Sequence, residues 1–218
     1  MNKQEPFVIT ISREVGSGGH TVGRILSEKL AVRYCDKQLL ESLQKELNLS
    51  AQAIERLKAE KKNWLKDILG AVSPLNMLSP MPAARVMDLG QGYTRELHSE
   101  VTSDEIFAAE VQILQGFAQM GSCVIAGRSG FYVFANHPNS LHVLITASMP
   151  YRIDRIMKKQ ALSEKEAKDL IDRIDKGRET YIRRYAGVSR YDARNYNLTI
   201  KADGHSAEEM ANLILSYM

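Results

Sequence analysis

Short apolar runs alternate with amphipathic stretches along most of the 218-residue chain. The runs are rich in β-branched residues and are bounded by glycine, serine and charged residues. Strands that alternate with helices in this way are typical of a parallel sheet whose two faces are covered by helices. We therefore predict five strands, at Phe7–Ser12, Val32–Cys35, Cys123–Ala126, Leu141–Thr146 and Tyr196–Lys201.

The stretches between these runs carry apolar side chains at the three- and four-residue spacing of a helix. The first stretch has Val22 and Leu26 on one face. Capping-box patterns, a Ser or Thr followed three residues later by Glu, begin the helices that follow Thr102, Ser163 and Ser206. We predict helices at His20–Ala31, Asp104–Met120 and Pro150–Gln160, from Ser163 to about Tyr185, and after Ser206.

The segment from residue 38 to residue 101 breaks the alternation. It has a helical pattern to about Leu69, and three prolines then interrupt it. Two interpretations remain open: a helical cap whose methionines fill irregular gaps in the packing, or a mobile lobe that binds a substrate. The length of the chain predicts a single domain over residues 1–218, with this segment as an insertion.

The composition is that of an ordinary globular protein, with 44% hydrophobic and 25% charged residues. The net charge of +3 is too small to indicate a nucleic acid partner, and no apolar run is long enough to cross a bilayer. Cys35 and Cys123 lie in predicted strands, where we expect buried thiols and neither a disulfide nor a zinc site. With no secretory signal at the N-terminus, we expect a cytoplasmic protein.

A glycine-rich turn, Gly16–Gly19, lies between the first predicted strand and the first predicted helix. Glycines let backbone N–H groups approach an anion, and the start of a helix adds unpaired donors and a favourable dipole. The arrangement of strand, loop and helix therefore indicates a phosphate site. The alternative is an ordinary glycine-rich turn that binds nothing.

The turn departs from the P-loop pattern G-x-x-x-x-G-K-[ST] because it lacks the lysine. In one alignment His20 stands in the place of the lysine, and Thr21 keeps the hydroxyl that would ligate Mg²⁺. In the other alignment Gly19 takes that place. Arg13, just after the first predicted strand, is a candidate to supply the missing positive charge.

Two charged residues, Asp36 and Arg128, directly follow neighbouring apolar runs of the predicted sheet. Ligands of open α/β sheets bind at the carboxyl ends of the strands, so we expect both side chains and the glycine turn to face one crevice. A carboxylate and a guanidinium beside a phosphate site could orient a hydroxylated, phosphorylated substrate. For each residue, a surface salt bridge is the alternative.

Positive charge is concentrated between Tyr151 and Arg194, where 13 Lys and Arg residues outnumber 8 Asp and Glu residues. Arg173 and Arg178 lie on one predicted helix of this segment, with Asp175 between them. Arginines on a helical lid suit phosphoryl transfer, because the transferred group spreads negative charge over its oxygens. The alternative is a solvated helix that is stabilised by ion pairs along its surface.

Several stretches, taken in order, resemble the cytidylate kinase-like family, a branch of the P-loop nucleoside monophosphate kinases. They are ITISREVGSGGHTVG, YCDKQLL, FAAEVQILQGFAQMGSCVIAGRSGFYVF, ASMPYRIDRIMKKQALSEKEAKDLIDRIDKGRETYIRRYAG and NYNLTI. The resemblance implies an α/β fold, a P-loop kinase-like three-layer α/β/α sandwich around a five-stranded parallel sheet. It also implies a helical acceptor lobe inserted at residues 38–101 and an arginine-bearing lid at residues 173–195.

The resemblance also assigns roles to residues by their position. The donor site, for ATP and its Mg²⁺, would comprise Gly16, Ser17, Gly18, Gly19, His20 and Thr21, with Thr21 as the metal ligand. Arg13 joins this site as the candidate substitute for the lysine and not through the resemblance. The acceptor site would comprise Asp36 and Arg128. The catalytic residues would be Arg128, Arg173, Asp175 and Arg178.

The chain departs from the family at two places. His20 replaces the arginine that usually follows the double glycine, and it is a weaker, pH-dependent cation. Established cytidylate kinases have acidic residues beside the Gly-Arg pair of the third strand, where this chain has Ala126 and Ser129. No carboxylate for Mg²⁺ is therefore evident at that strand.

Together these features predict ATP-dependent phosphoryl transfer to a nucleoside monophosphate, with CMP as a candidate acceptor. One alternative is a kinase of the same fold that acts on another small phosphate acceptor. A second is a nucleotide-binding module that has lost catalysis with the lysine, and a nucleic acid binder is a less favoured third. The Met- and Pro-rich segment could pack against a second copy of the chain, so a homo-oligomer stays open.

Overall fold

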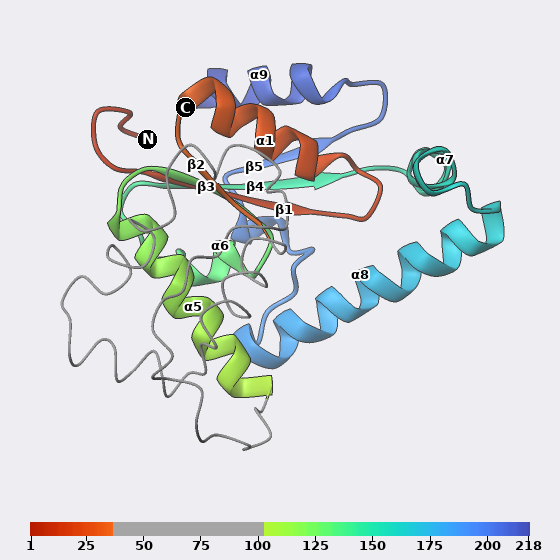
Figure 1. Cartoon of the computed structure of the whole chain (residues 1–218), viewed down its shortest axis with the longest axis horizontal. Coiled ribbons are helices and arrows are strands. Elements are labelled where there is room, and N and C mark those ends of the chain that lie inside the picture. The colour runs from red at the N-terminus through yellow and green to blue at the C-terminus, as the bar shows by residue number, and fades with distance from the viewer. Residues whose placement is uncertain (37–102) are drawn as a thin grey trace, which may run out of the picture.

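The computed structural model describes residues 1–36 and 103–218, and this part of the chain forms one five-stranded sheet. Neighbouring strands are all parallel, in the order β2-β3-β1-β4-β5 (Figure 1). The predicted α/β fold with five parallel strands is therefore confirmed. The strands are β1 (Val8–Arg13), β2 (Arg33–Cys35), β3 (Cys123–Ala126), β4 (Ser140–Thr146) and β5 (Leu198–Lys201).

The helices predicted in this part of the chain are confirmed, with their ends shifted by no more than about one residue, whereas α6 and η2 were not predicted. The predicted insertion at residues 38–101 lies outside the described residues, as does the capping residue Thr102. No described helix is long and apolar enough to cross a membrane. The helices are α1 (Gly19–Leu30), α5 (Ser103–Gln119), α6 (Gly130–Val133), α7 (Met149–Gln160), α8 (Glu164–Ala186), the 3₁₀ helix η2 (Ala193–Asn195) and α9 (Ala207–Tyr217).

Two hydrophobic clusters cover the two faces of the sheet. On one face α1 and α9 lie side by side, and Leu26 and Ile214 pack in the same cluster as Ile9 of β1 (Figure 1). On the other face α5 contributes Leu114 and Phe117. Full burial of one such side chain stabilises the fold by roughly 1.5–3 kcal/mol. These contacts hold the sheet between helices, so that its edge provides a fixed base for a site.

Both cysteines are buried and free, as the sequence predicts. Cys35 ends β2 and Cys123 begins β3, and their side chains pack in the cluster beneath α5. Burial raises the pKa of the Cys123 thiol to about 12, so this group stays protonated at neutral pH. The two cysteines therefore act as small apolar side chains.

The carboxyl ends of three neighbouring strands bring predicted site residues to one edge of the sheet. Arg13 is the last residue of β1, Asp36 follows β2, and Gly127 and Arg128 follow β3. Because β3 lies between β1 and β2, these residues come from adjacent positions along the edge. The glycine turn begins at the same edge and leads into α1.

The helices α7 and α8 extend this edge outward. Ile156 of α7 packs against Ala167 and Ile171 of α8, and α8 begins with the predicted capping box at Ser163. From α7 the helix α8 runs diagonally toward α5 (Figure 1), where the rings of Phe107 and Tyr185 stack at 4.3 Å. The segment predicted as a lid, residues 173–195, corresponds to the second half of α8, the loop after it and η2.

Candidate active site

The turn between β1 and α1 needs glycine at two positions. Gly16 and Gly18 have φ angles of 83° and 86°, in the left-handed region that disfavours other residues. A Cβ atom at Gly16 would lie 2.8 Å from the carbonyl oxygen of Arg152, at the start of α7. The side chain of Ser17 is buried and donates a hydrogen bond to the carbonyl of Glu14 at 2.9 Å. The turn is therefore tightly packed against α7.

The first turn of α1 is open to an anion. Gly18 is the N-cap residue and provides no side-chain acceptor, and the first turn of the helix contains no acidic residue. Within the described part of the chain, the amides of Gly19, His20 and Thr21 donate no hydrogen bond, because helix starts leave their first donors unpaired. Donors of this kind, with the helix dipole behind them, suit a phosphate group.

A buried carboxylate joins the turn to α7 and α8. Asp175 of α8 accepts hydrogen bonds from the backbone amide of Val15, at 3.2 and 3.3 Å. It also pairs with three arginines: Arg152, Arg178 at 3.5 Å and Arg190 at 3.3 Å. The predicted residues Asp175 and Arg178 thus lie against the glycine turn.

Arg152 and Arg190 are functional candidates that the sequence does not single out. Arg152 also pairs with Glu14 at 3.2 Å and donates to the carbonyl of Val15 at 2.7 Å. Arg190 donates to the carbonyl of Arg13 and is held in place by the hydroxyl of Tyr196, which donates to the carbonyl of Arg190 at 2.7 Å. Arg178 donates to the same carbonyl of Arg13, at 3.2 Å. The backbone that leaves β1 is therefore fixed by arginines from α7, α8 and the following loop.

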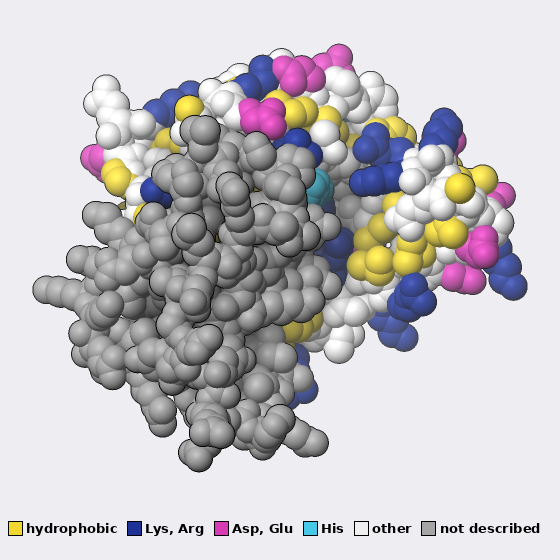
Figure 2. All heavy atoms as spheres, in the orientation of Figure 1, with side chains coloured by type: hydrophobic (Ala, Val, Ile, Leu, Met, Phe, Trp, Pro, Cys, Tyr) yellow, Lys and Arg dark blue, Asp and Glu magenta, His cyan; other side chains and the backbone are white. Residues whose placement is uncertain are grey.

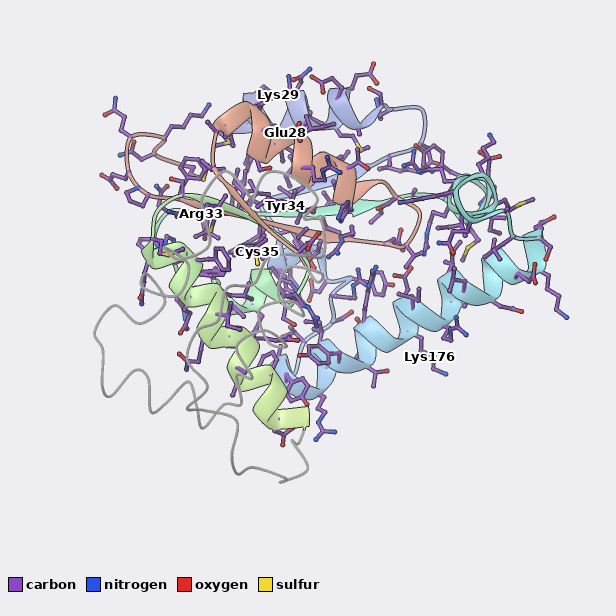
Figure 3. All side chains as sticks on the ribbon, viewed as in Figure 1. Glu28, Lys29, Arg33, Tyr34, Cys35 and Lys176 are labelled. Carbon is purple, nitrogen blue, oxygen red and sulfur yellow. The ribbon has the colours of Figure 1, made fainter. Side chains whose placement is uncertain are left out.

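His20 and Asp36 form a pair at the start of α1. The Nε2 atom of His20 lies 2.9 Å from Oδ2 of Asp36. The hydroxyl of Tyr34 donates to the carbonyl of His20 at 3.3 Å, and its ring meets the imidazole edge-on at 5.8 Å. Tyr34 lies between α1 and the sheet (Figure 3). His20 is therefore engaged with the end of β2 and does not lie over the glycine turn as a free cation.

Arg128, in the turn after β3, is held by an acidic residue from a helix. Its guanidinium pairs at 2.7 Å with Glu110 of α5, which also accepts a hydrogen bond from the hydroxyl of Tyr181 at 2.9 Å. Arg128 and Ser129 both have positive φ angles, 54° and 56°. Such backbone costs on the order of 1–3 kcal/mol and often occurs at functional sites. The turn after β3 is therefore a constrained support for Arg128.

A cavity of about 520 Å³ lies among these elements. It brings together four arginines, which are Arg13, Arg128, Arg178 and Arg190, and its described lining contains no carboxylate. The described lining also includes Ser12, Ala126, Gly127, Ser129, Phe131, Ile174, Gly177, Tyr181 and Ile182. A mixed wall of arginines, aromatic rings and aliphatic side chains suits an anionic ligand with an apolar part. Figure 2 shows further Lys and Arg side chains on α7 and α8.

The structure brings most, but not all, of the predicted catalytic residues together. Arg173 is exposed on α8 and does not line the cavity. Lys176, three residues further on, points away from the sheet (Figure 3). Thr21 lies exposed in the first turn of α1, next to His20. Among the described residues, no group of three or more His, Cys, Asp or Glu side chains is placed to hold a metal ion.

Comparisons with known proteins identify a family and a shared fold. The cytidylate kinase-like family matches residues 8–203. An uncharacterized protein from Eubacterium ventriosum superposes with a TM-score of 0.67 at 20% identity, covering 97% of each chain. A shikimate kinase from Bacteroides thetaiotaomicron superposes with a TM-score of 0.51 at 14% identity, also covering 97% of each chain. No curated protein sequence matches significantly. At these identities the superpositions establish a shared P-loop kinase-like fold.

Proposed function

Because the chain belongs to the cytidylate kinase-like family, we propose that it transfers a phosphoryl group from ATP to a nucleoside monophosphate, with CMP as the first acceptor to test. The observation that carries this proposal is the cavity with four arginines at the carboxyl edge of the sheet, one of which, Arg13, also contacts Gly19 of the glycine turn. A kinase of this kind binds ATP and a nucleoside monophosphate side by side. It therefore needs cationic side chains and backbone N–H donors close together to bind the phosphates of both. The family and fold support a nucleotide-dependent kinase. That the acceptor is a nucleoside monophosphate is our proposal.

The donor triphosphate would bind at the glycine turn and the first turn of α1. The open amides of Gly19, His20 and Thr21 fit phosphate oxygens, and the Thr21 hydroxyl fits a ligand of Mg²⁺. Bound MgATP would supply the phosphoryl group that is transferred. Magnesium is commonly held by one or two carboxylates together with substrate phosphates. Thr21 would supply a hydroxyl, and the described residues contain no group of three or more His, Cys, Asp or Glu side chains that could hold the metal.

The acceptor would bind in the cavity. Arg128 reaches it from β3, and its position is fixed by Glu110. Phe131 and Tyr181 provide apolar surface for a base or sugar. Asp36 lies at the end of β2 beside His20. We propose that Arg128 binds the acceptor phosphate and that Asp36 orients the acceptor through its hydroxyl or amino groups.

The arginines of the proposed lid would stabilise charge during transfer. Arg178 and Arg190 line the cavity and are both tied to Asp175, which keeps their guanidiniums near the turn. Preorganised charges at a reacting group contribute more than charges that must reorient during the reaction. The arrangement favours Arg178 and Arg190 in this role over the exposed Arg173, and closure of the lid would exclude water from the transfer.

The proposal is tested by incubating the protein with ATP, Mg²⁺ and each common nucleoside monophosphate in turn, and separating the products by chromatography. We expect a nucleoside diphosphate with one acceptor, reduced on the order of 10²–10³ in rate by Arg128→Ala. Arg33→Ala is the control, because Arg33 begins β2 at the opposite end of the sheet and contacts the carbonyl of Met120. The absence of any diphosphate, alongside an active control kinase, would contradict the proposal.

A further inference from the structure

The side chain of Arg13 runs between two glycines at the end of β1. A Cβ atom at Gly19 would lie 2.6 Å from the Cβ atom of Arg13 and 3.2 Å from its Cγ atom. A Cβ atom at Gly127 would collide with the guanidinium itself. The stem of Arg13 therefore passes beneath the start of α1, and its guanidinium lies beside the turn after β3. Both glycines leave room for this one side chain.

Among the described residues, Arg13 differs from the other arginines of the cavity in having no carboxylate within ion-pair distance. Arg128 pairs with Glu110, and Arg178 and Arg190 pair with Asp175. Within the described part of the chain, the guanidinium of Arg13 forms no ion pair and donates no hydrogen bond. Burial, with Arg178 as the next cause, lowers the pKa of Arg13 to about 10. The group is thus charged at neutral pH. Tyr34 and Asp36 favour this charge from a distance, and a bound anion would pair with it directly.

The position of Arg13 is fixed although its guanidinium forms no ion pair with the described residues. Arg178 and Arg190 both donate to its backbone carbonyl, and its side chain is confined by Gly19 and Gly127. A buried charge without a partner costs several kcal/mol, and a bound anion offsets that cost. A guanidinium held in this way can donate two parallel hydrogen bonds to a phosphate.

Neither of the two positions that align with the P-loop lysine, Gly19 and His20, provides an unpaired positive charge above the turn in the described structure. At Gly19 any longer side chain would begin in contact with Arg13. At His20 the imidazole is directed to Asp36, 2.9 Å away. In either alignment of the turn, Arg13 is the cavity-lining arginine whose side chain contacts the first residue of α1, and it forms no ion pair among the described residues.

We infer that Arg13 takes the place of the P-loop lysine and binds the phosphates of the donor nucleotide. This inference rests on the proposed function, because it presumes that a triphosphate occupies the glycine turn. The cation reaches the phosphates from the end of the strand before the turn, whereas a P-loop lysine reaches them from the start of the helix after it. This role also explains the glycines at positions 19 and 127, because a side chain at either position would collide with Arg13.

The test measures binding of a non-hydrolysable ATP analogue with Mg²⁺ by isothermal titration calorimetry. Arg13→Met should weaken binding by about 10- to 100-fold, as expected for the loss of charged hydrogen bonds, and Arg13→Lys should retain most of the affinity. Arg24→Met is the matched control, because Arg24 lies exposed on α1 and its guanidinium pairs with Glu28 at 3.8 Å, one turn further along the helix. Arg155→Met is a second comparison, because Arg155 lies beside Gly18 and over the ring of Tyr151 at 5.7 Å.

A double variant, Arg13→Gly with Gly19→Lys, moves the cation to the helix and should recover binding that Arg13→Met loses. This swap also separates loss of charge from loss of folding, which thermal unfolding of each variant checks. Equal affinity in Arg13→Met and the unchanged protein would overturn the inference, and so would a loss of binding that appears only in Arg155→Met.

The same titration separates the inference from the proposed function. If the unchanged protein binds the analogue but phosphorylates no nucleoside monophosphate, the proposed acceptor class is wrong, and the Arg13 variants still decide the role of Arg13. If the unchanged protein does not bind the analogue at all, both the donor site and the role of Arg13 are contradicted.

Discussion

Neutralising Asp175 should destabilise the protein, because this one carboxylate balances several buried charges. Asp175, Arg152 and Arg190 are 6%, 5% and 4% exposed, and Arg178 and the amide of Val15 also contact the carboxylate. Breaking a buried pair by removing one partner costs about 3–5 kcal/mol. Asparagine keeps the shape and one acceptor oxygen, so we expect Asp175→Asn to lie near the lower limit, about 3 kcal/mol.

The loss is measured by thermal unfolding followed by circular dichroism at neutral pH. For a chain of this size, a change of about 3 kcal/mol lowers the melting temperature by about 6–12 °C. Asp172→Asn is the matched control, because Asp172 is exposed on the same helix, and it should change stability by less than about 0.5 kcal/mol. If Asp175→Asn melts within about 2 °C of the unchanged protein, the buried network does not hold the turn as described.

Three further predictions concern the sheet and its edge. Gly127→Ala should displace the guanidinium of Arg13 and force a residue with a side chain to a φ of 79°, lowering stability by about 1–2 kcal/mol in denaturant titrations and weakening ATP binding. Burial lowers the pKa of His142 in the folded protein, so protonation of this side chain favours the unfolded state. The free energy of unfolding should therefore fall as the pH drops below about 6.5, the pKa of an unperturbed histidine. Between about pH 7 and about pH 5, it should fall less in His142→Gln than in the unchanged protein. Cys35 and Cys123 should react with a thiol reagent only after denaturation, and rapid reaction of the native protein would contradict their burial.

The elements were predictable from sequence because each is encoded locally. Apolar β-branched runs define the strands, and the Ser163 and Ser206 capping boxes define two helix starts. The short helix α6 escaped prediction because it depends on the turn after β3, where Arg128 and Ser129 take up left-handed backbone. Neither residue type indicates such a conformation in a sequence.

The sequence predicted those site residues that directly follow a strand, because the end of a parallel strand fixes where the next residue lies. Asp36 and Arg128 were expected at the carboxyl edge because they follow strands, and both lie there. Glu110, which fixes Arg128, comes from a distant part of α5, and no spacing in the sequence connects the two residues. Long-range pairs of this kind depend on how helices pack against the sheet.

Helix geometry could have separated Arg173 from its neighbours. Asp175 and Arg178 are three residues apart and share one face of α8, where their side chains lie 3.5 Å apart. Arg173 is two residues from Asp175, a spacing that places it on the opposite side of a helix, and it is exposed. Arg152 could not have been found in this way, because its partners Glu14 and Asp175 lie on other elements.

The most direct test of the central claim follows the transferred phosphoryl group. The protein is incubated with Mg²⁺, CMP and ATP that is radiolabelled in its terminal phosphate, and the labelled products are separated. We predict that the label appears in a nucleoside diphosphate, and that replacing CMP by other monophosphates identifies the preferred acceptor. Label that stays in ATP, or is released only as inorganic phosphate with every nucleoside monophosphate, would contradict the account.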